Sequence, residues 1–408
     1  MPVEAAAIAP GEAGEIVVAL DGGTDERGAE ELERRLGQRF PRHRATILAA
    51  RRSAGEIALA PPGGAGPAPT PASERSARAT AEGAVPGPVS ALGALLREGV
   101  QRRAAAVALV AAAPHDASAD WLGLLLEPVL EGGFEYVCPT YLRRRADAPL
   151  NTGIIYPLMR ALYGQRLRQP LGGEAALALP LAARLLDDPD WRKDPAHAGS
   201  DAWLVAKVLA GRHRVCQAWL GARPRARDGD GGASETLTRA LGLVFREMER
   251  YASRWQREEG SQPVPTFGSG GWLAGDAPRV NVERLLDTFR LAARDLAPVW
   301  ALVLPPATLL GLRHAGAGRS NAFRISDGAW ARIIYDFAVA HFVKTIERRQ
   351  LLASLTPLYL GWIASFVQET QGLDETSFEA RVEALCSAFE AEKSYLISRW
   401  RWPDGFNP

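Results

Sequence analysis

The chain has 408 residues, 47% of them hydrophobic and 23% charged, a composition typical of a folded protein with a large core. Its 48 basic and 47 acidic side chains nearly cancel, so no overall charge favours nucleic acid or an anionic membrane surface. Cys138, Cys216 and Cys386 are far apart and show no CxxC spacing, which argues against a disulfide framework or a zinc site. We find neither a signal-like start nor an apolar run of about 20 residues, and expect a cytoplasmic protein without a membrane span.

The first 60 residues predict the start of a parallel sheet. Glu15–Leu20 and Ala45–Ala50 are short apolar runs typical of buried strands, and Glu30–Phe40 has the spacing of an amphipathic helix. This β-α-β order favours parallel strands with helices outside them. Residues 61–88 are dense in Pro, Gly, Ala and Ser, and we interpret them as a flexible loop within the first domain. An interdomain linker is the weaker interpretation, because strand signals resume directly afterwards.

Further segments complete an α/β domain over residues 1–232. The patterns predict helices at Ser90–Arg103, Asp120–Leu130, Asn151–Tyr163 and Ala175–Leu186, and strands at Ala105–Ala112, Phe134–Cys138 and Arg214–Trp219. Beyond the Gly- and Asp-rich stretch 228–232, strand alternation nearly disappears and long segments with a period of 3.6 follow. These segments are Leu237–Trp255, Val282–Val303, Trp330–Glu347, Leu351–Thr370 and Phe378–Trp400. They predict an all-helical C-terminal domain over residues 233–408.

Two short motifs within the first domain carry candidate functional residues. Arg168–Glu174 reads Arg-Gln-Pro-Leu-Gly-Gly-Glu, in which two glycines allow close approach of the backbone to a ligand and a carboxylate follows at once. Arg168 and Gln169 offer hydrogen bonds to hydroxyls or anions. Gly199–Trp203 adds a second acid, Asp201, placed like a helix N-cap. Each motif alone is also explained as the start of a capped helix.

Taken together, these motifs resemble a known family. The matching segments are Asp120–Leu122, Glu127–Leu130, Tyr136–Arg143, Asn151–Gly164, Arg168–Glu174, Asp201–Trp203, Cys216–Ala222, Val264–Gly268, Asn281–Arg284, Tyr335–Ala338 and Leu355–Gly361. In these segments the chain resembles a bacterial family 2-type glycosyltransferase and is similar to the mannosylglycerate and glucosylglycerate synthase group. The resemblance covers residues 90–400 well and 15–60 weakly.

The resemblance implies a GT-A-like fold, a mostly parallel sheet that holds a nucleotide-sugar, followed by an all-helical domain on the acceptor side. The implied reaction transfers a hexose from a nucleoside-diphosphate sugar to a small hydroxy acid such as glycerate. A divalent cation, Mg²⁺ or Mn²⁺, held by an Asp-x-Asp pair normally neutralises the leaving diphosphate. By the same resemblance, Glu174 and Asp201 are catalytic. The implied substrate-binding residues are Arg143, Asn151, Thr152, Arg168, Gln169, Gly172 and Gly173.

The sequence departs from this family pattern on the donor side. The positions expected for the metal-binding aspartates are Ala111 and Ala113, and alanine has no ligand atom. Arg225 stands where a downstream histidine is expected, and arginine is not a metal ligand. We therefore expect no metal-binding residues of the usual kind. The glycine-lysine-glycine turn expected before the helix at Ser90 is also missing.

Two hypotheses from different classes follow. In the first, the chain is an active transferase in which Arg223, Arg225 and Arg227 replace the cation at the diphosphate. The alternative interpretation of these arginines is a solvent-exposed basic loop without a binding role. In the second, it is a catalytically impaired relative that acts as a binding or scaffold subunit. Trp362 and Phe366 predict either a helix core or a homo-oligomer interface.

Overall fold

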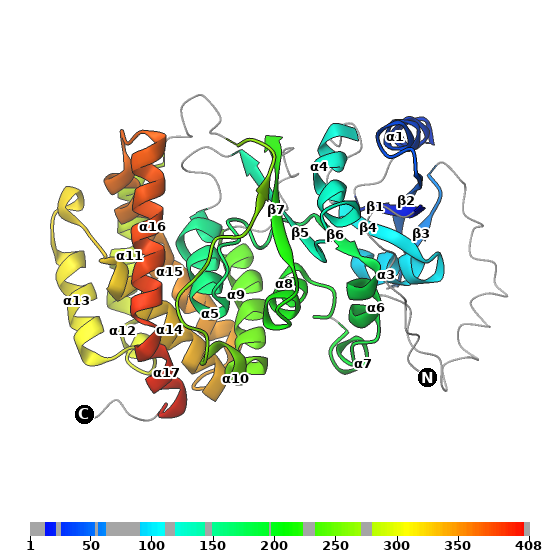
Figure 1. Cartoon of the computed structure of the whole chain (residues 1–408). Coiled ribbons are helices and arrows are strands. Elements are labelled where there is room, and N and C mark those ends of the chain that lie inside the picture. The colour runs from blue at the N-terminus through cyan, green and yellow to red at the C-terminus, as the bar shows by residue number, and fades with distance from the viewer. Residues whose placement is uncertain are drawn as a thin grey trace.

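The protein consists of a layered α/β part followed by a helical part, as seen in a computed structural model (Figure 1). The structure describes residues 13–21, 26–53, 56–62, 90–110, 119–142, 149–195, 197–222, 233–270 and 280–403. Within these ranges, the expected α/β fold with a mostly parallel sheet and a helical C-terminal region is confirmed. The predicted loop 61–88 lies almost wholly outside the described residues.

A single mixed sheet organises the α/β part. In the described residues its strands are β1 (Gly14–Leu20), β2 (His43–Ser53), β3 (Glu56–Ala60), β4 (Ala104–Val110), β5 (Tyr136–Leu142), β6 (Ala175–Ala178), β7 (Val215–Ala222) and β8 (Thr266–Phe267). Their order is β3-β2-β1-β4-β6-β5-β7-β8. Strands β2, β1 and β4 are mutually parallel, as are β5, β7 and β8, whereas β3 and β6 are antiparallel to their neighbours.

Helices cover both faces of this sheet (Figure 1). They are α1 (Glu26–Arg39), α3 (Ala91–Gln101), α4 (Ala119–Leu130), α5 (Tyr156–Tyr163), α6 (Leu179–Leu186), α7 (Asp190–Lys193) and α8 (Asp201–Ala210). Because successive strand residues point to opposite faces, Ile16 and Val18 pack with α1 and α4, while Val17 and Ala19 face the core on the other side. There α3 and α6 contact the sheet, and the core continues through α5 and α8.

The helical part shares this second core. Its helices are α9 (Ala233–Arg250), α10 (Ala252–Trp255), α11 (Val282–Asp295), α12 (Ala297–Trp300), α13 (Pro306–Ala317), α14 (Asp327–Val343), α15 (Arg348–Thr370), α16 (Glu375–Ala391) and α17 (Lys393–Arg401). One continuous hydrophobic cluster joins Leu95 and Leu158 of the α/β part to Phe245 and Trp330. The edge strand β8 belongs to the sheet although it follows residue 232. The predicted domain boundary at residue 232 therefore does not divide the chain into two parts with separate cores.

Three local predictions are corrected by the structure. Ala175–Leu186 is not one helix: its first four residues form β6, and α6 begins at Leu179 with Pro180 in its first turn. Ser200, rather than Asp201, caps α8, because the Ser200 hydroxyl accepts a hydrogen bond from the Trp203 N–H. Asn151–Ile155 forms a π-helix, η1, ahead of α5.

Trp362 lies in the core of the helical part. Its ring is 1% exposed and stacks on Trp330 and Phe366. In the described part of the chain, α15 is the one helix long and apolar enough to cross a membrane by length and composition. Of its most apolar window, 61% is buried inside the fold, as expected for the central helix of a bundle and in agreement with the predicted absence of a membrane span.

Arg160 of α5 ties the two parts together. Its guanidinium is 1% exposed and donates to both carboxylate oxygens of Glu383, at 2.6 and 2.7 Å, and to Glu390 at 2.8 Å. Ser261 accepts a further hydrogen bond at 2.9 Å. The negative charges offset the burial of the guanidinium, so the pKa of Arg160 is raised. This buried cation depends on two acids of α16.

Removing both acids should leave an uncompensated buried charge. We expect the double variant Glu383→Gln/Glu390→Gln to lose about 3–5 kcal/mol of unfolding free energy in denaturant titrations. The control is Glu375→Gln on the same helix, whose exposed side chain should change stability by no more than about 0.5 kcal/mol. A double variant as stable as this control would show that Arg160 does not require its partners.

Asp336 of α14 is a second buried charge, and it is less well compensated. Its side chain is 1% exposed; Oδ1 accepts from Tyr395 at 2.7 Å and from Arg399 at 3.2 Å, whereas Oδ2 has no partner among the described residues. Burial raises the pKa of Asp336 to about 6. The folded state therefore holds this proton more tightly than the unfolded chain does.

This difference predicts a pH dependence of stability. Protonated Asp336 stabilises the fold below about pH 4, and that contribution is lost as the pH rises through about 6. Asp336→Asn removes this titration, so the stability of the variant minus that of the parent should increase by about 3 kcal/mol between pH 4 and pH 7. Urea titrations of both proteins at each pH measure the difference. A difference that stays constant across this range would contradict the raised pKa.

Candidate functional site

Parallel strands of this sheet end together at one edge. Strands β1, β4, β5 and β7 point the same way, so their carboxyl ends meet there. The Asp21 N–H donates to the Val110 carbonyl at 2.9 Å and joins the ends of β1 and β4. Between these two strands the order reverses, because the chain proceeds outward to β2 and β3 and returns on the other side of β1. In open α/β sheets such a switch point is where ligands bind.

The reversed strand β6 brings the Arg168–Glu174 motif to the same edge. Ala175 is paired with Leu109, next to the end of β4, and Ala178 is paired with Ala106 farther down. Since β6 runs against its neighbours, the residues just before it lie where β4 and β5 finish. Glu174 therefore stands level with the carboxyl end of β4, and its side chain is 4% exposed.

Hydrogen bonds hold the motif against β5 and β7. The Gln169 side-chain amide donates to the Tyr141 carbonyl at 3.0 Å, and the Cys138 thiol donates to the Gln169 carbonyl at 3.4 Å. Gln217 of β7 accepts from the Arg168 N–H at 2.5 Å. Gln217 was not predicted as a site residue, although a glutamine within an apolar strand sequence was a signal for it.

The structure explains why the motif has glycine at positions 172 and 173. A Cβ on Gly172 would lie 2.3 Å from Cγ of Pro139, so the loop could not approach β5 so closely with another residue. Gly173 has φ of 86°, a conformation that L residues rarely adopt. Both therefore shape the loop in front of Glu174, and their predicted contact with substrate stays a prediction.

The π-helix η1 meets the motif from the other side. The Asn151 side-chain amide donates to the Arg168 carbonyl at 2.9 Å, while its Oδ1 is buried with no partner among the described residues. Thr152 is 8% exposed on the same turn. Trp330 of α14 donates its indole N–H to the Gly153 carbonyl at 2.8 Å. One helical turn that departs from α geometry is thus held between the motif and the helical part, and π-turns often occur at functional sites.

The two predicted catalytic acids both influence the pKa of one residue of β5. Burial raises the pKa of the Cys138 thiol, and the negative charges of Asp201 and Glu174 raise it further. Asp201 also contributes to the raised pKa of Tyr136, after burial and Cys138. Both carboxylates thus lie within electrostatic reach of the same part of β5, although Glu174 precedes β6 and Asp201 begins α8. Asp201 is half-buried in the first turn of α8.

The Arg168 side chain is engaged by Glu379 and Tyr156. Its guanidinium is 3.2 Å from Glu379 of α16 and rests over the Tyr156 ring, 5.1 Å from the centroid. These contacts tie the motif to the helical part. The predicted binding role of this side chain would require it to exchange an existing ion pair for a ligand.

Several predicted positions lie outside the described residues. On the donor side these are Ala111, Ala113 and Arg225 with its neighbouring arginines, and on the acceptor side Arg143. Within the described ranges, no group of three or more His, Cys, Asp or Glu residues is arranged to hold a metal ion. The described residues therefore do not fit the cation that the resemblance implies.

Comparison with models of known protein families gave no match to this chain, and comparison with curated proteins gave none either. The family resemblance therefore rests on the sequence motifs alone.

Substitutions of the motif glycines test this geometry. Gly172→Ala should cost about 1–3 kcal/mol of stability, because its methyl group must displace the Pro139 ring. Gly173→Ala should cost about 1–2 kcal/mol, because its backbone is left-handed. The control is Gly37→Ala in α1, where a Cβ meets nothing within 4 Å and the substitution should stabilise by about 0.4–1 kcal/mol. Thermal unfolding of the three variants gives the comparison; equal stability of all three would refute this view of the loop.

Proposed function

We propose that this chain is a glycosyltransferase-like protein of GT-A-like fold that transfers a hexose from a nucleoside-diphosphate sugar to a small hydroxy acid such as glycerate. The observation that carries the proposal is the position of β6. It sets the Glu174 loop beside the β1–β4 switch point, where an α/β sheet receives a ligand. The resemblance in the Arg168–Glu174 and Asp201–Trp203 motifs supplies the chemistry, since fold alone does not give function.

In this proposal the acceptor side is formed by η1 and the chain that follows β5. Thr152 hydrogen-bonds the acceptor hydroxyl, and the unpartnered Asn151 Oδ1 accepts from a ligand hydroxyl. Arg143, one residue after β5, holds the acceptor carboxylate. Glu174 and Asp201 bind sugar hydroxyls and stabilise the positive charge that develops at the anomeric carbon in the transition state.

The second candidate is a catalytically impaired relative that keeps the fold as a binding or scaffold subunit. The observation that favours it is the alanine pair 111 and 113 where carboxylates are expected, together with the lack of an acidic metal cluster in the described ranges. Buried acids such as Glu174 are compatible with either candidate. The two candidates differ in whether a donor is bound and consumed.

Donor titration separates the two candidates. UDP-, GDP- and ADP-glucose and the matching mannose donors are titrated with and without Mn²⁺, and binding is followed by calorimetry. The proposed transferase binds at least one of them and releases the nucleoside diphosphate when glycerate is added. Binding without turnover would favour the impaired relative, and failure to bind any of these donors would refute the transferase proposal.

For a donor that binds and reacts, Glu174→Gln tests the site itself. Removing the negative charge should lower kcat by about 100-fold or more, since the charge acts mainly in the transition state. Glu131→Gln, at an exposed position just after α4, is the matched control and should keep the parent activity. Unchanged kcat in Glu174→Gln, with thermal stability also unchanged, would remove Glu174 from the proposed mechanism.

A further inference from the structure

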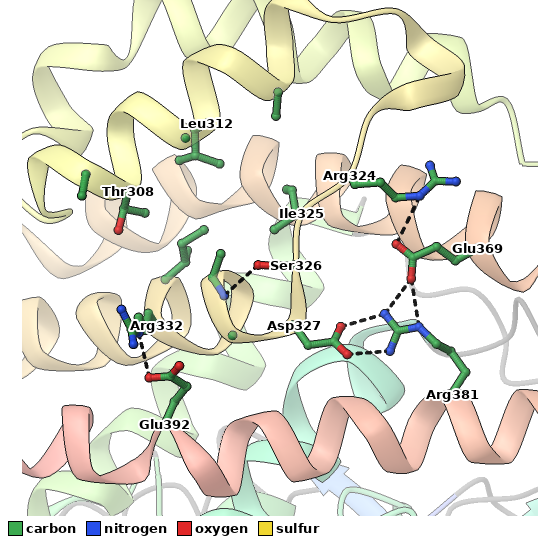
Figure 2. A pocket seen from close by; sticks show the side chains of 16 residues that line it. Thr308, Leu312, Arg324, Ile325, Ser326, Asp327, Arg332, Glu369, Arg381 and Glu392 are labelled. Atoms are coloured by element: carbon green, nitrogen blue, oxygen red, sulfur yellow. Dashed lines mark hydrogen bonds and ion pairs between the residues drawn. The ribbon is translucent and has the colours of Figure 1, made fainter.

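A pocket of about 880 Å³ lies in the helical part, between α13 and the start of α14 (Figure 2). It is bounded on the other sides by Glu369 near the end of α15, by Arg381 of α16 and by Glu392. Its size falls within the range of sites for small organic molecules. None of its residues belongs to the candidate site at the sheet edge, and the function proposed above does not use it.

The acidic groups that line this pocket are already engaged (Figure 2). Both oxygens of Asp327 accept from Arg381, at 2.7 and 2.9 Å. Glu369 accepts from the Arg381 Nε at 2.9 Å and from the Ser365 hydroxyl at the same distance. These carboxylates are held in place by buried or half-buried partners. They are therefore poor candidates to receive a cationic ligand.

Donor groups, in contrast, remain available. Arg332 donates through Nε to Glu392 at 2.7 Å, and its two terminal nitrogens have no acceptor among the described residues. Arg324 uses one terminal nitrogen for the Phe323 carbonyl and Gln368, at 2.7 and 2.9 Å, and its Nε lies 3.6 Å from Glu369. Its other terminal nitrogen has no acceptor in the described ranges. Both side chains are about half exposed, at 50% and 43%. The remaining N–H groups of both guanidinium groups can therefore donate to anionic oxygens.

The walls between these arginines are apolar. Leu312 of α13 and Ile325, just before α14, lie at the pocket (Figure 2) but are almost fully buried, at 5% and 4% exposure. The apolar surface open to a ligand comes from Ala307, Ala315 and Ala329, which line the pocket at exposed or half-buried positions. Gly311 leaves further space, because a Cβ built there meets no atom within 4 Å. A ligand that filled the volume would bury the surface of these alanines while its charged end reached an arginine.

We propose that this pocket binds a small amphipathic molecule that carries a carboxylate or phosphate group on an apolar body. The unused N–H groups of Arg324 and Arg332 receive the anionic oxygens, and the apolar walls receive the body. Charge complementarity sets the class of ligand, since Asp327 and Glu369 are held by Arg381 and the N–H groups left on Arg324 and Arg332 are cationic donors.

Octanoate and octyl phosphate serve as probes of the two anionic groups, with acetate, octanol and octylamine as comparisons in calorimetric titrations of the full chain. We expect at least one of the two anionic probes to bind, about tenfold or more tightly than acetate, octanol and octylamine. A preference between the two probes distinguishes a carboxylate ligand from a phosphate ester. Equal binding of octanol or octylamine would overturn the anionic assignment, and so would failure of both anionic probes to bind.

Variants locate the site. Gly311→Phe fills the open space and should abolish probe binding, whereas Gly37→Phe, at another helical glycine with nothing within 4 Å, should bind as the parent does. Arg324→Gln/Arg332→Gln should weaken binding by about tenfold or more, with Arg313→Gln on the exposed side of α13 as the matched control. Unfolding temperatures of all variants verify the fold. Probe binding that survives both Gly311→Phe and the double arginine substitution would overturn the proposed location.

Discussion

The arrangement of the candidate site depends on one reversed strand. A parallel β6 would have placed the residues before it at the opposite edge of the sheet, away from the ends of β4 and β5. Because β6 pairs antiparallel with both neighbours, Glu174 instead stands beside the switch point. The loop before β6 runs against β5, and Gly172 lets it lie directly on Pro139. Its position follows from sheet pairing rather than from side-chain contacts alone.

The helical part contacts the residues at this edge of the sheet and holds them in place. Arg160 and Arg168 both reach carboxylates of α16, and Trp330 satisfies a carbonyl of η1. Gly153 lies so close to Trp362 that a Cβ there would be 2.2 Å from the ring. These contacts fix the turn that carries Asn151 and Thr152. The α/β part could therefore not hold η1 in this shape without the helices that follow it.

Strands with long apolar runs could be predicted from the sequence, because a local run of apolar residues is enough to indicate a buried strand. These strands are β1, β2, β4, β5 and β7. Ala175–Ala178 could not, since Ala and Leu are helix formers and only pairing with distant Ala106–Leu109 makes them a strand. For the site, the acids were found by resemblance. Gln217, which anchors the motif, escaped because its role depends on a loop 49 residues away. The end of each parallel strand, where donor-side residues were expected, passes into chain outside the described ranges.

The sheet edge and the helical pocket share one element. On α14, Trp330 faces η1, whereas Ala329 and Ile333 line the pocket on another side of the same helix. Protein interiors are packed too densely for one side of a helix to move without the other. Any movement of α14 would therefore change the Trp330–Gly153 hydrogen bond. Spatial connection alone does not establish energetic coupling. It does identify that hydrogen bond as a physical route by which the state of the pocket and the position of Thr152 could be linked.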